Sequence, residues 1–150
     1  MRAVIQRVSK CNLSISHTEY SSIGTGLLVL LGIEESDITE DVDWLCGKIS
    51  RLRVFDDSEG VMNLSVLDIS GEIMIVSQFT LHASTRKGNR PSYVRSARPE
   101  TAVPLYETFI AKMELELGKK AGTGIFGAHM EINMVNDGPV TILLDSKNRE

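Results

Sequence analysis

Two short stretches carry residue types that could bind a ligand or do chemistry: SQFTL at residues 77–81 and NDGPVT at residues 136–141. The SQFTL motif brings hydroxyl and amide groups to the end of an apolar run, a common place for functional groups. In the NDGPVT motif a proline directly follows an Asp-Gly pair. Asp-Gly between alternating apolar runs predicts a β-hairpin, whereas proline removes a donor where the ladder would begin. The residues alone leave open whether Gly138-Pro139 is an ordinary turn or a backbone shaped for use.

Catalysis by a familiar set of side chains is not indicated. Thr80 and His82 would lie on one face of a strand, but no carboxylate is placed to complete a triad with them. Ser77 and Thr80 can equally be hydroxyls that satisfy the backbone at a strand end. The Cys and His residues lack the paired spacing of zinc sites, and the Gly-Thr-Gly stretches lack the rest of a phosphate loop. The sequence therefore predicts neither a metal nor a cofactor.

Positive charge is concentrated in one segment. The 150-residue chain has a formal net charge of −4, which argues against a protein that coats nucleic acid indiscriminately. Residues 82–99 nevertheless contain no Asp or Glu but several Arg and Lys, and we call residues 84–98 the basic arm. Such a run is often only a solvated surface, but it could also hold phosphates locally. The candidates for a tRNA contact are Arg86, Lys87 and Arg90.

The surrounding pattern predicts an α+β fold that places both motifs at strand ends. Alternating or buried apolar runs indicate strands at residues 11–15, 24–33, 61–66, 72–81, 129–135 and 140–145. One helix should begin at Asp37, in a capping box with Glu40, and a second should run from about residue 100 to 117 and stop at Gly118. We expect a single compact domain over residues 1–150, with a curved or closed, barrel-like β-sheet backed by the two helices.

The chain is also expected to be cytoplasmic. Its two cysteines, Cys11 and Cys46, fit a reducing compartment better than a disulfide framework. No apolar run reaches the length of a membrane span, and the first residues lead into a strand pattern rather than a signal peptide.

The SQFTL and NDGPVT motifs together resemble the D-aminoacyl-tRNA deacylase family. Similar stretches occur in the same order at residues 4–8, 26–32, 62–64, 86–92 and 126–128, so the resemblance spans essentially the whole chain. Either motif alone is short, but both at this spacing are specific. The resemblance implies an editing hydrolase that cleaves the ester between a D-amino acid and the terminal adenosine of tRNA. It also implies removal of glycine mischarged on tRNA-Ala.

The resemblance further implies a homodimer with the active site at its interface. The Gly138-Pro139 segment of one subunit, with a cis bond, would reach into the pocket of the other and reject L-aminoacyl esters. The tRNA itself would assist the attack of water, so that no cofactor is needed. We expect the main chain at Phe79 and Thr80 to act in catalysis. The implied substrate-binding residues are Ser77, Gln78, Met130, Gly138 and Pro139.

Three alternatives stay open. One is the related deacylase type whose Gly-Pro bond is trans and whose selectivity is relaxed, although that type departs from Ser-Gln-Phe-Thr. Another is a non-catalytic module that binds tRNA or a nucleotide. The third is a stand-alone editing domain like that of threonyl-tRNA synthetase, which shares this architecture.

Overall fold

The structure, a computed structural model, describes residues 1–149 and is built around one long strand. β1 (Arg2–Ile15) pairs along one edge with β8 (Met130–Asp145), and along the other with β3 (Gly26–Gly32) and then β2 (Thr18–Ile23), all antiparallel. β6 (Glu72–Ser77) joins β3 in parallel, and the short β7 (Gly122–Thr123) joins β6 in parallel. The sheet order is β2-β1-β3-β6-β7, with β8 also paired to β1.

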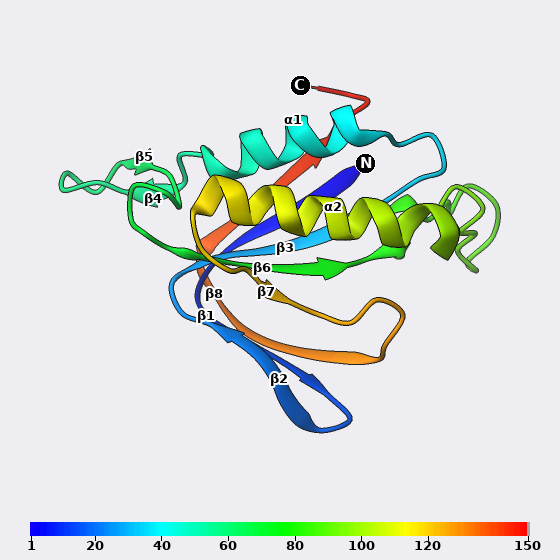
Figure 1. Ribbon diagram of the computed structural model, residues 1–150, viewed down its shortest axis with the longest axis horizontal. Helices are drawn as coiled ribbons and strands as arrows, with labels where there is room; N and C mark the ends of the chain where they lie inside the picture. Colours follow the sequence, from blue (N-terminus) through cyan, green and yellow to red (C-terminus); the bar gives the residue numbers. More distant parts are fainter. Residues whose placement is uncertain (150) are drawn as a thin grey trace.

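Two helices lie side by side over one face of this sheet (Figure 1). They are α1 (Thr39–Ser50) and α2 (Pro99–Leu117), and they bury the apolar stripes that their sequences predict. The main core lies between these stripes and the alternate residues of β1, β3 and β6. Its fully buried members include Val42, Leu45, Ile49, Phe109 and Met113.

The far half of the sheet curls away from the helices and encloses a second core. β2 and the first part of β8 bend beneath β3 and β6 (Figure 1). Alternate side chains of these strands meet there, including Cys11, Leu13, Leu28, Met74 and Val76. The predicted α+β fold, a nearly closed sheet backed by two helices, is confirmed.

The hairpin predicted at the NDGPVT motif is wrong. β8 is one continuous strand through residues 130–145, and it pairs with β1 on both sides of the motif. Asn136 faces Val8 and Thr141 faces Gln6, so residues 137–140 bulge out opposite Arg7. The Asp-Gly signal is satisfied by this bulge, where Gly138 has a φ of 120° that an L side chain rarely adopts. The chain therefore leaves the ladder and rejoins it without reversing.

Other predicted strand boundaries need correction. β6 ends at Ser77, because residues 79–82 form a short 3₁₀ turn, η1 (Phe79–His82), instead of continuing the strand. The strand predicted over residues 61–66 is only β5 (Met62–Leu64), which pairs with β4 (Phe55–Asp56) in a projecting hairpin.

The N-cap of α1 also lies one residue later than predicted. Ile38 is the N-cap, and its N–H donates to Asp41 Oδ2 at 2.9 Å. Asp37 is not free to cap the helix, because it is buried, accepts from the N–H of Glu34 and pairs with the terminal amine of Met1. The predicted end of α2 is confirmed, with Gly118 at the C-cap in the left-handed conformation. Neither helix among residues 1–149 has the length and apolar character needed to cross a bilayer.

Candidate functional site

The SQFTL motif forms an open turn where the buried strand β6 ends. Gln78 N–H donates to Leu31 O at 2.7 Å, which fixes the end of the strand against β3. The first hydrogen bond of η1 runs from Leu81 N–H to Gln78 O, at 3.2 Å. The N–H groups of Phe79 and Thr80 precede that bond, so the turn offers them no acceptor of its own. Two successive main-chain donors therefore lie just past the carboxyl end of β6 without a partner inside the turn.

Gly32 lets this turn pack closely onto β3. A Cβ atom at Gly32 would lie 3.0 Å from Gln78 O and 2.9 Å from Leu81 Cβ, closer than ordinary contacts. Arg2 closes the turn from the side of β1, since its Nη1 donates to Leu81 O at 3.0 Å. A cavity of about 310 Å³ lies next to Leu81 and is also lined by Arg2, Val4 and Leu143. The turn is therefore rigidly held beside an open space.

The side chains of the turn are engaged with one another. Gln78 Nε2 donates to Thr80 Oγ1 at 2.7 Å, so the Thr80 hydroxyl serves as a structural partner of the amide. His82, two residues on, is buried, with Nδ1 3.9 Å from Glu34 Oε2. Burial lowers the pKa of His82 below its ordinary value, although the charge of Glu34 opposes this shift. Thr80 and His82 do not form the strand-face pair considered from the sequence, because the chain has left the strand.

The base of the basic arm is tied to the same turn. Ser96 Oγ donates to Phe79 O at 2.8 Å, and the ring of Tyr93 makes an edge-to-face contact with Phe79, with centroids 4.9 Å apart. Arg95 pairs with Glu34 at 2.9 Å. Burial raises the pKa of Glu34, but the hydrogen bond and charge of Arg95 more than offset this and bring the pKa below its ordinary value.

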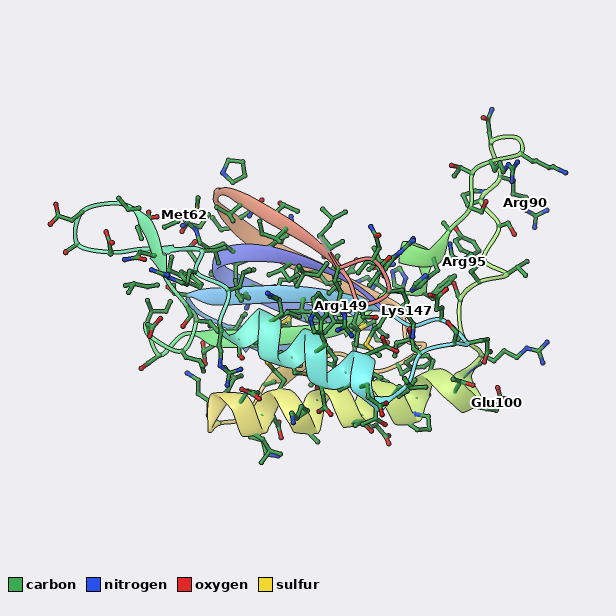
Figure 2. The ribbon with its side chains drawn as sticks, turned by 90° about the horizontal axis from the view of Figure 1, so that it is seen from above. Met62, Arg90, Arg95, Glu100, Lys147 and Arg149 are labelled. Atoms are coloured by element: carbon green, nitrogen blue, oxygen red, sulfur yellow. The ribbon has the colours of Figure 1, made fainter. Side chains whose placement is uncertain are left out.

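Beyond this base the arm extends from the body of the protein. Figure 2 shows Arg90 far out on the arm and Arg95 closer to the sheet. Two hydrogen bonds between Ser84 and Ser92 close the arm into a loop. The predicted tRNA-contact residues Arg86, Lys87 and Arg90 are all exposed on it.

The NDGPVT bulge is held by Arg7, which the sequence reasoning missed. The Arg7 side chain is buried, and its Nε lies 3.3 Å from Asp137 O and 3.1 Å from Asp137 Oδ2. Its Nη1 donates to Val54 O at 2.6 Å, which anchors the guanidinium in the main body. Asn136 Nδ2 donates to Arg7 O and Val140 O across the base of the bulge. The bulge displays Gly138 and Pro139, joined by a cis peptide bond, as exposed backbone.

A signal for Arg7 was present in the sequence. Ala3, Ile5 and Arg7 alternate along β1 and are buried, so Arg7 continues an apolar stripe. A charged residue in such a position must be paired or hydrogen-bonded, which indicates a structural or functional role.

One chain brings some of the predicted site residues together and keeps others apart. Ser77, Gln78, Phe79 and Thr80 form the turn at the Arg2 end of β1, and Met130 packs on the second core, which includes Val76. Gly138 and Pro139 lie beside Arg7, in the middle of β1. Arg2 and Arg7 are five positions apart along the strand, or about 17 Å at ~3.3 Å per residue. Within residues 1–149, no cluster of three His, Cys, Asp or Glu side chains is arranged to hold a metal.

The fold and these two motifs define a small α+β protein with a nearly closed sheet and a main-chain turn as its candidate site. Residues 4–145 match the sequence profile of the family described as D-Tyr-tRNA(Tyr) deacylase. Proteins named D-aminoacyl-tRNA deacylase from Flavobacterium johnsoniae and Bacteroides thetaiotaomicron are 57% and 59% identical to this chain over 150 residues, covering 100% of both chains in each case. The chain belongs to this deacylase family, and the resemblance of its two motifs is confirmed.

Solved structures share the fold of this chain. The structure of a protein named c-Myc DNA Unwinding Element Binding Protein is similar with a TM-score of 0.90 and 39% identity, covering 97% of this chain and 98% of the other. A probable eukaryotic D-amino acid tRNA deacylase has a TM-score of 0.83 at 16% identity, covering 95% and 97% of the two chains, and so shares the fold.

Proposed function

We propose that this protein is a D-aminoacyl-tRNA deacylase, an ester hydrolase that releases the D-amino acid and free tRNA. Membership of the deacylase family over nearly the full chain supports the reaction. The observation that carries the mechanism is the pair of N–H groups at Phe79 and Thr80, which the turn leaves without an internal acceptor.

Attack of water on the ester carbonyl creates an oxyanion, and two main-chain donors fixed in advance are suited to stabilise it. An aminoacyl ester is already activated and lies next to a ribose hydroxyl that can donate or accept a hydrogen bond. We therefore propose that the turn stabilises the oxyanion and that the ribose hydroxyl of the tRNA assists the attack of water. We assign Ser77, Gln78 and Met130 to the pocket for the terminal adenosine, since Ser77 and Gln78 belong to the turn and Met130 packs on the second core, which includes Val76 near the end of β6.

Selection of the D form is assigned to the Gly138-Pro139 backbone. D- and L-aminoacyl esters carry the same groups and differ only in the configuration at the α-carbon, where the hydrogen and the side chain exchange places. One small site cannot hold every D side chain by attraction, but a rigid wall near the α-carbon can exclude every L side chain. The Arg7 and Asn136 hydrogen bonds give the bulge that rigidity. Glycine has no side chain to exclude, so the same wall leaves glycine mischarged on tRNA-Ala open to hydrolysis.

We propose a homodimer with the site at its interface, and the separation of the two motifs within one chain supports it. In an isologous dimer the same surface patch of both subunits forms the interface. The SQFTL turn of each subunit can then contact the NDGPVT bulge of the other, which gives two equivalent contacts. Between the SQFTL turn and the NDGPVT bulge, the sheet face has an apolar centre where Val4 lies opposite Leu143, which is 74% exposed. Polar pairs flank this centre, Arg2 with Asp145 on one side and Gln6 with Thr141 on the other. Packing two copies antiparallel through this face would cover Leu143 and bring Gly138 of one subunit beside Phe79 of the other.

The basic arm is assigned the acceptor end of the tRNA, because Arg86, Lys87 and Arg90 project beside the turn on an otherwise acidic protein. We place the reaction in the cytoplasm, in keeping with the two free, buried cysteines. The experiment that tests the activity is the release of D-tyrosine from D-tyrosyl-tRNA by the purified protein, with glycyl-tRNA-Ala as a second substrate. Hydrolysis no faster than that of the ester alone would refute the assignment.

A second candidate is a nucleic-acid-binding protein without catalysis. The exposed basic arm favours it, and the 39% identical protein of known structure is named for binding a DNA element. This candidate predicts DNA or tRNA binding with no release of D-tyrosine, so the same assay separates the two functions.

A further inference from the structure

Phe79 and Tyr93 form an exposed aromatic surface that the proposed chemistry does not use. Phe79 acts in that chemistry through its main chain, yet its side chain is 55% exposed and Tyr93 is 40% exposed. Large aromatic side chains on a protein surface usually mark a binding site when they cluster beside a functional one. Here Phe79 belongs to the SQFTL turn and Tyr93 to the basic arm, so the aromatic pair lies where these two segments meet.

The geometry of the pair suits stacking. The two rings meet edge to face, at an interplanar angle of 71°. An edge-to-face contact uses the edge of one ring and one face of the other. The first ring therefore keeps both of its faces available for stacking on another aromatic group. Ser96 links the two residues, because its Oγ donates to Phe79 O and its N–H donates to Tyr93 O. The next residue, Ala97, donates its N–H to Ile33 O, just beyond the end of β3. The pair is thus a held aromatic surface and not two loose side chains.

The surrounding charge indicates which partner would stack there. The arm that bears Tyr93 has Arg86, Lys87 and Arg90 on its outer part, and no acidic residue occurs between residues 82 and 99. A positive track beside exposed aromatic rings is the usual arrangement for single-stranded nucleic acid, where bases stack and phosphates are neutralised. RNA bases that are free of a duplex are recognised in this way.

We infer that Tyr93 and Phe79 stack a base of the single-stranded 3′ end of the tRNA, at the nucleotide that precedes the terminal adenosine. The terminal adenosine enters the pocket beside the turn, and the preceding base lies on the aromatic pair while its phosphates face the arm. This inference rests on the proposed function, because it takes the tRNA ester as the substrate. The stacking contact would extend the part of the tRNA that the protein recognises from the terminal adenosine to the nucleotide before it.

The test compares a long and a short substrate. In Tyr93→Ala, kcat/KM should fall about tenfold more for D-tyrosyl-tRNA than for D-tyrosyl-adenosine, because only the tRNA carries the stacked base. Tyr93→Phe keeps the ring and should retain the wild-type ratio. Tyr93→Leu keeps apolar packing on Phe79 but has no π face, so it should show the same selective loss on D-tyrosyl-tRNA. It provides the test if Tyr93→Ala folds poorly. Tyr20→Ala, which removes a tyrosine of β2 that is 51% exposed, is the matched control.

A direct readout uses a ribo-oligonucleotide of the tRNA 3′ end with 2-aminopurine next to the terminal adenosine. Wild-type protein should quench its fluorescence, and Tyr93→Leu should lose most of that quenching. Equal losses of kcat/KM on both substrates, unchanged quenching in Tyr93→Leu, or conversion of the variant to a monomer would overturn the inference. Failure of the wild type to hydrolyse D-tyrosyl-tRNA at all would instead remove the proposed function, while the quenching still reports on the aromatic pair.

Discussion

At the scale of single residues, main-chain atoms are assigned the work that many hydrolases give to side chains. The Thr80 hydroxyl accepts a hydrogen bond from Gln78, and His82 lies buried away from it. Neither is arranged as a nucleophile or a base. The Phe79 and Thr80 N–H groups, in contrast, belong to the open side of a turn that the packing of Gly32 against Gln78 holds in place.

Two substitutions at Thr80 separate these roles. Thr80→Ala keeps the N–H and should keep activity on D-tyrosyl-tRNA within about tenfold, whereas a nucleophile would lose at least about 10³-fold. Thr80→Pro removes the N–H and should lower kcat by about 10²–10³, the usual effect of one oxyanion donor. Single-turnover kinetics measures both. A near-complete loss in Thr80→Ala with tRNA binding intact would contradict the main-chain mechanism.

Arg7 is the residue whose replacement tests the positioning of the bulge. Arg7 reaches Asp137 and Val54 O with two separate nitrogens of its planar guanidinium, Nε and Nη1, and the single ammonium of lysine does not reproduce this fork, so Arg7→Lys should let the bulge shift. A displacement of about 1 Å can cost ~10²-fold, and we expect kcat/KM on D-tyrosyl-tRNA to fall at least about tenfold. Arg51→Lys is the control, because the Arg51 guanidinium pairs with Glu116 of α2 at 2.8 Å and makes no contact with the bulge. Activity unaffected by Arg7→Lys would show that the bulge needs no such support.

At the scale of elements, the basic arm is a loop that is anchored to the sheet at its base and projects outward from there. Its tether is the Glu34–Arg95 pair and the Ser96 hydrogen bond, whereas its charged outer part is exposed to a ligand. The affinity that it provides should therefore depend strongly on salt.

Reversing two charges on the arm measures that dependence. The double variant Arg86→Glu and Arg90→Glu should weaken tRNA binding and flatten the plot of log K against log salt by about 1.5, since each phosphate contact contributes ~0.7–0.9. The double variant Lys48→Glu and Arg53→Glu places the same charge change elsewhere and should leave the slope nearly unchanged. An unaltered slope in the arm variant would dismiss the tRNA contact.

The elements also show what the sequence could and could not predict. Periodicity located both helices and the buried strand β3, because burial on one face imposes a repeat that the chain displays directly. It misread residues 136–141 as a hairpin, since Asp-Gly satisfies a bulge as well as a turn and only the pairing partner decides between them. Arg7 and Tyr93 escaped notice because their roles depend on contacts with residues 130 and 14 positions away.

At the scale of the whole molecule, we propose that the site is completed by two copies of the chain. The SQFTL turn lies at the Arg2 end of β1 and the NDGPVT bulge at its middle, and the surface between them includes the exposed Leu143. This arrangement predicts that neither motif functions with the other motif of its own chain.

Mixing two inactive variants tests this prediction. Gly138→Ala places a Cβ 2.8 Å from Val140 Cγ2 at a φ of 120°, so it should displace the wall beside the substrate α-carbon and block productive binding of the D ester as well. Mixed with Thr80→Pro, it should form heterodimers in which one site of two has both motifs intact. Random exchange should then restore about a quarter of wild-type activity. No recovery, although subunits exchange as shown by mass spectrometry, would place both motifs of a site in one chain.

The central claim is that handedness is enforced by a fixed stretch of main chain, and one comparison tests it most directly. Rates of hydrolysis of D-tyrosyl-tRNA and L-tyrosyl-tRNA are measured with the same enzyme and the same tRNA. We expect rapid release of D-tyrosine and release of L-tyrosine close to the uncatalysed rate. Hydrolysis of the two mirror-image esters at comparable rates would contradict the claim.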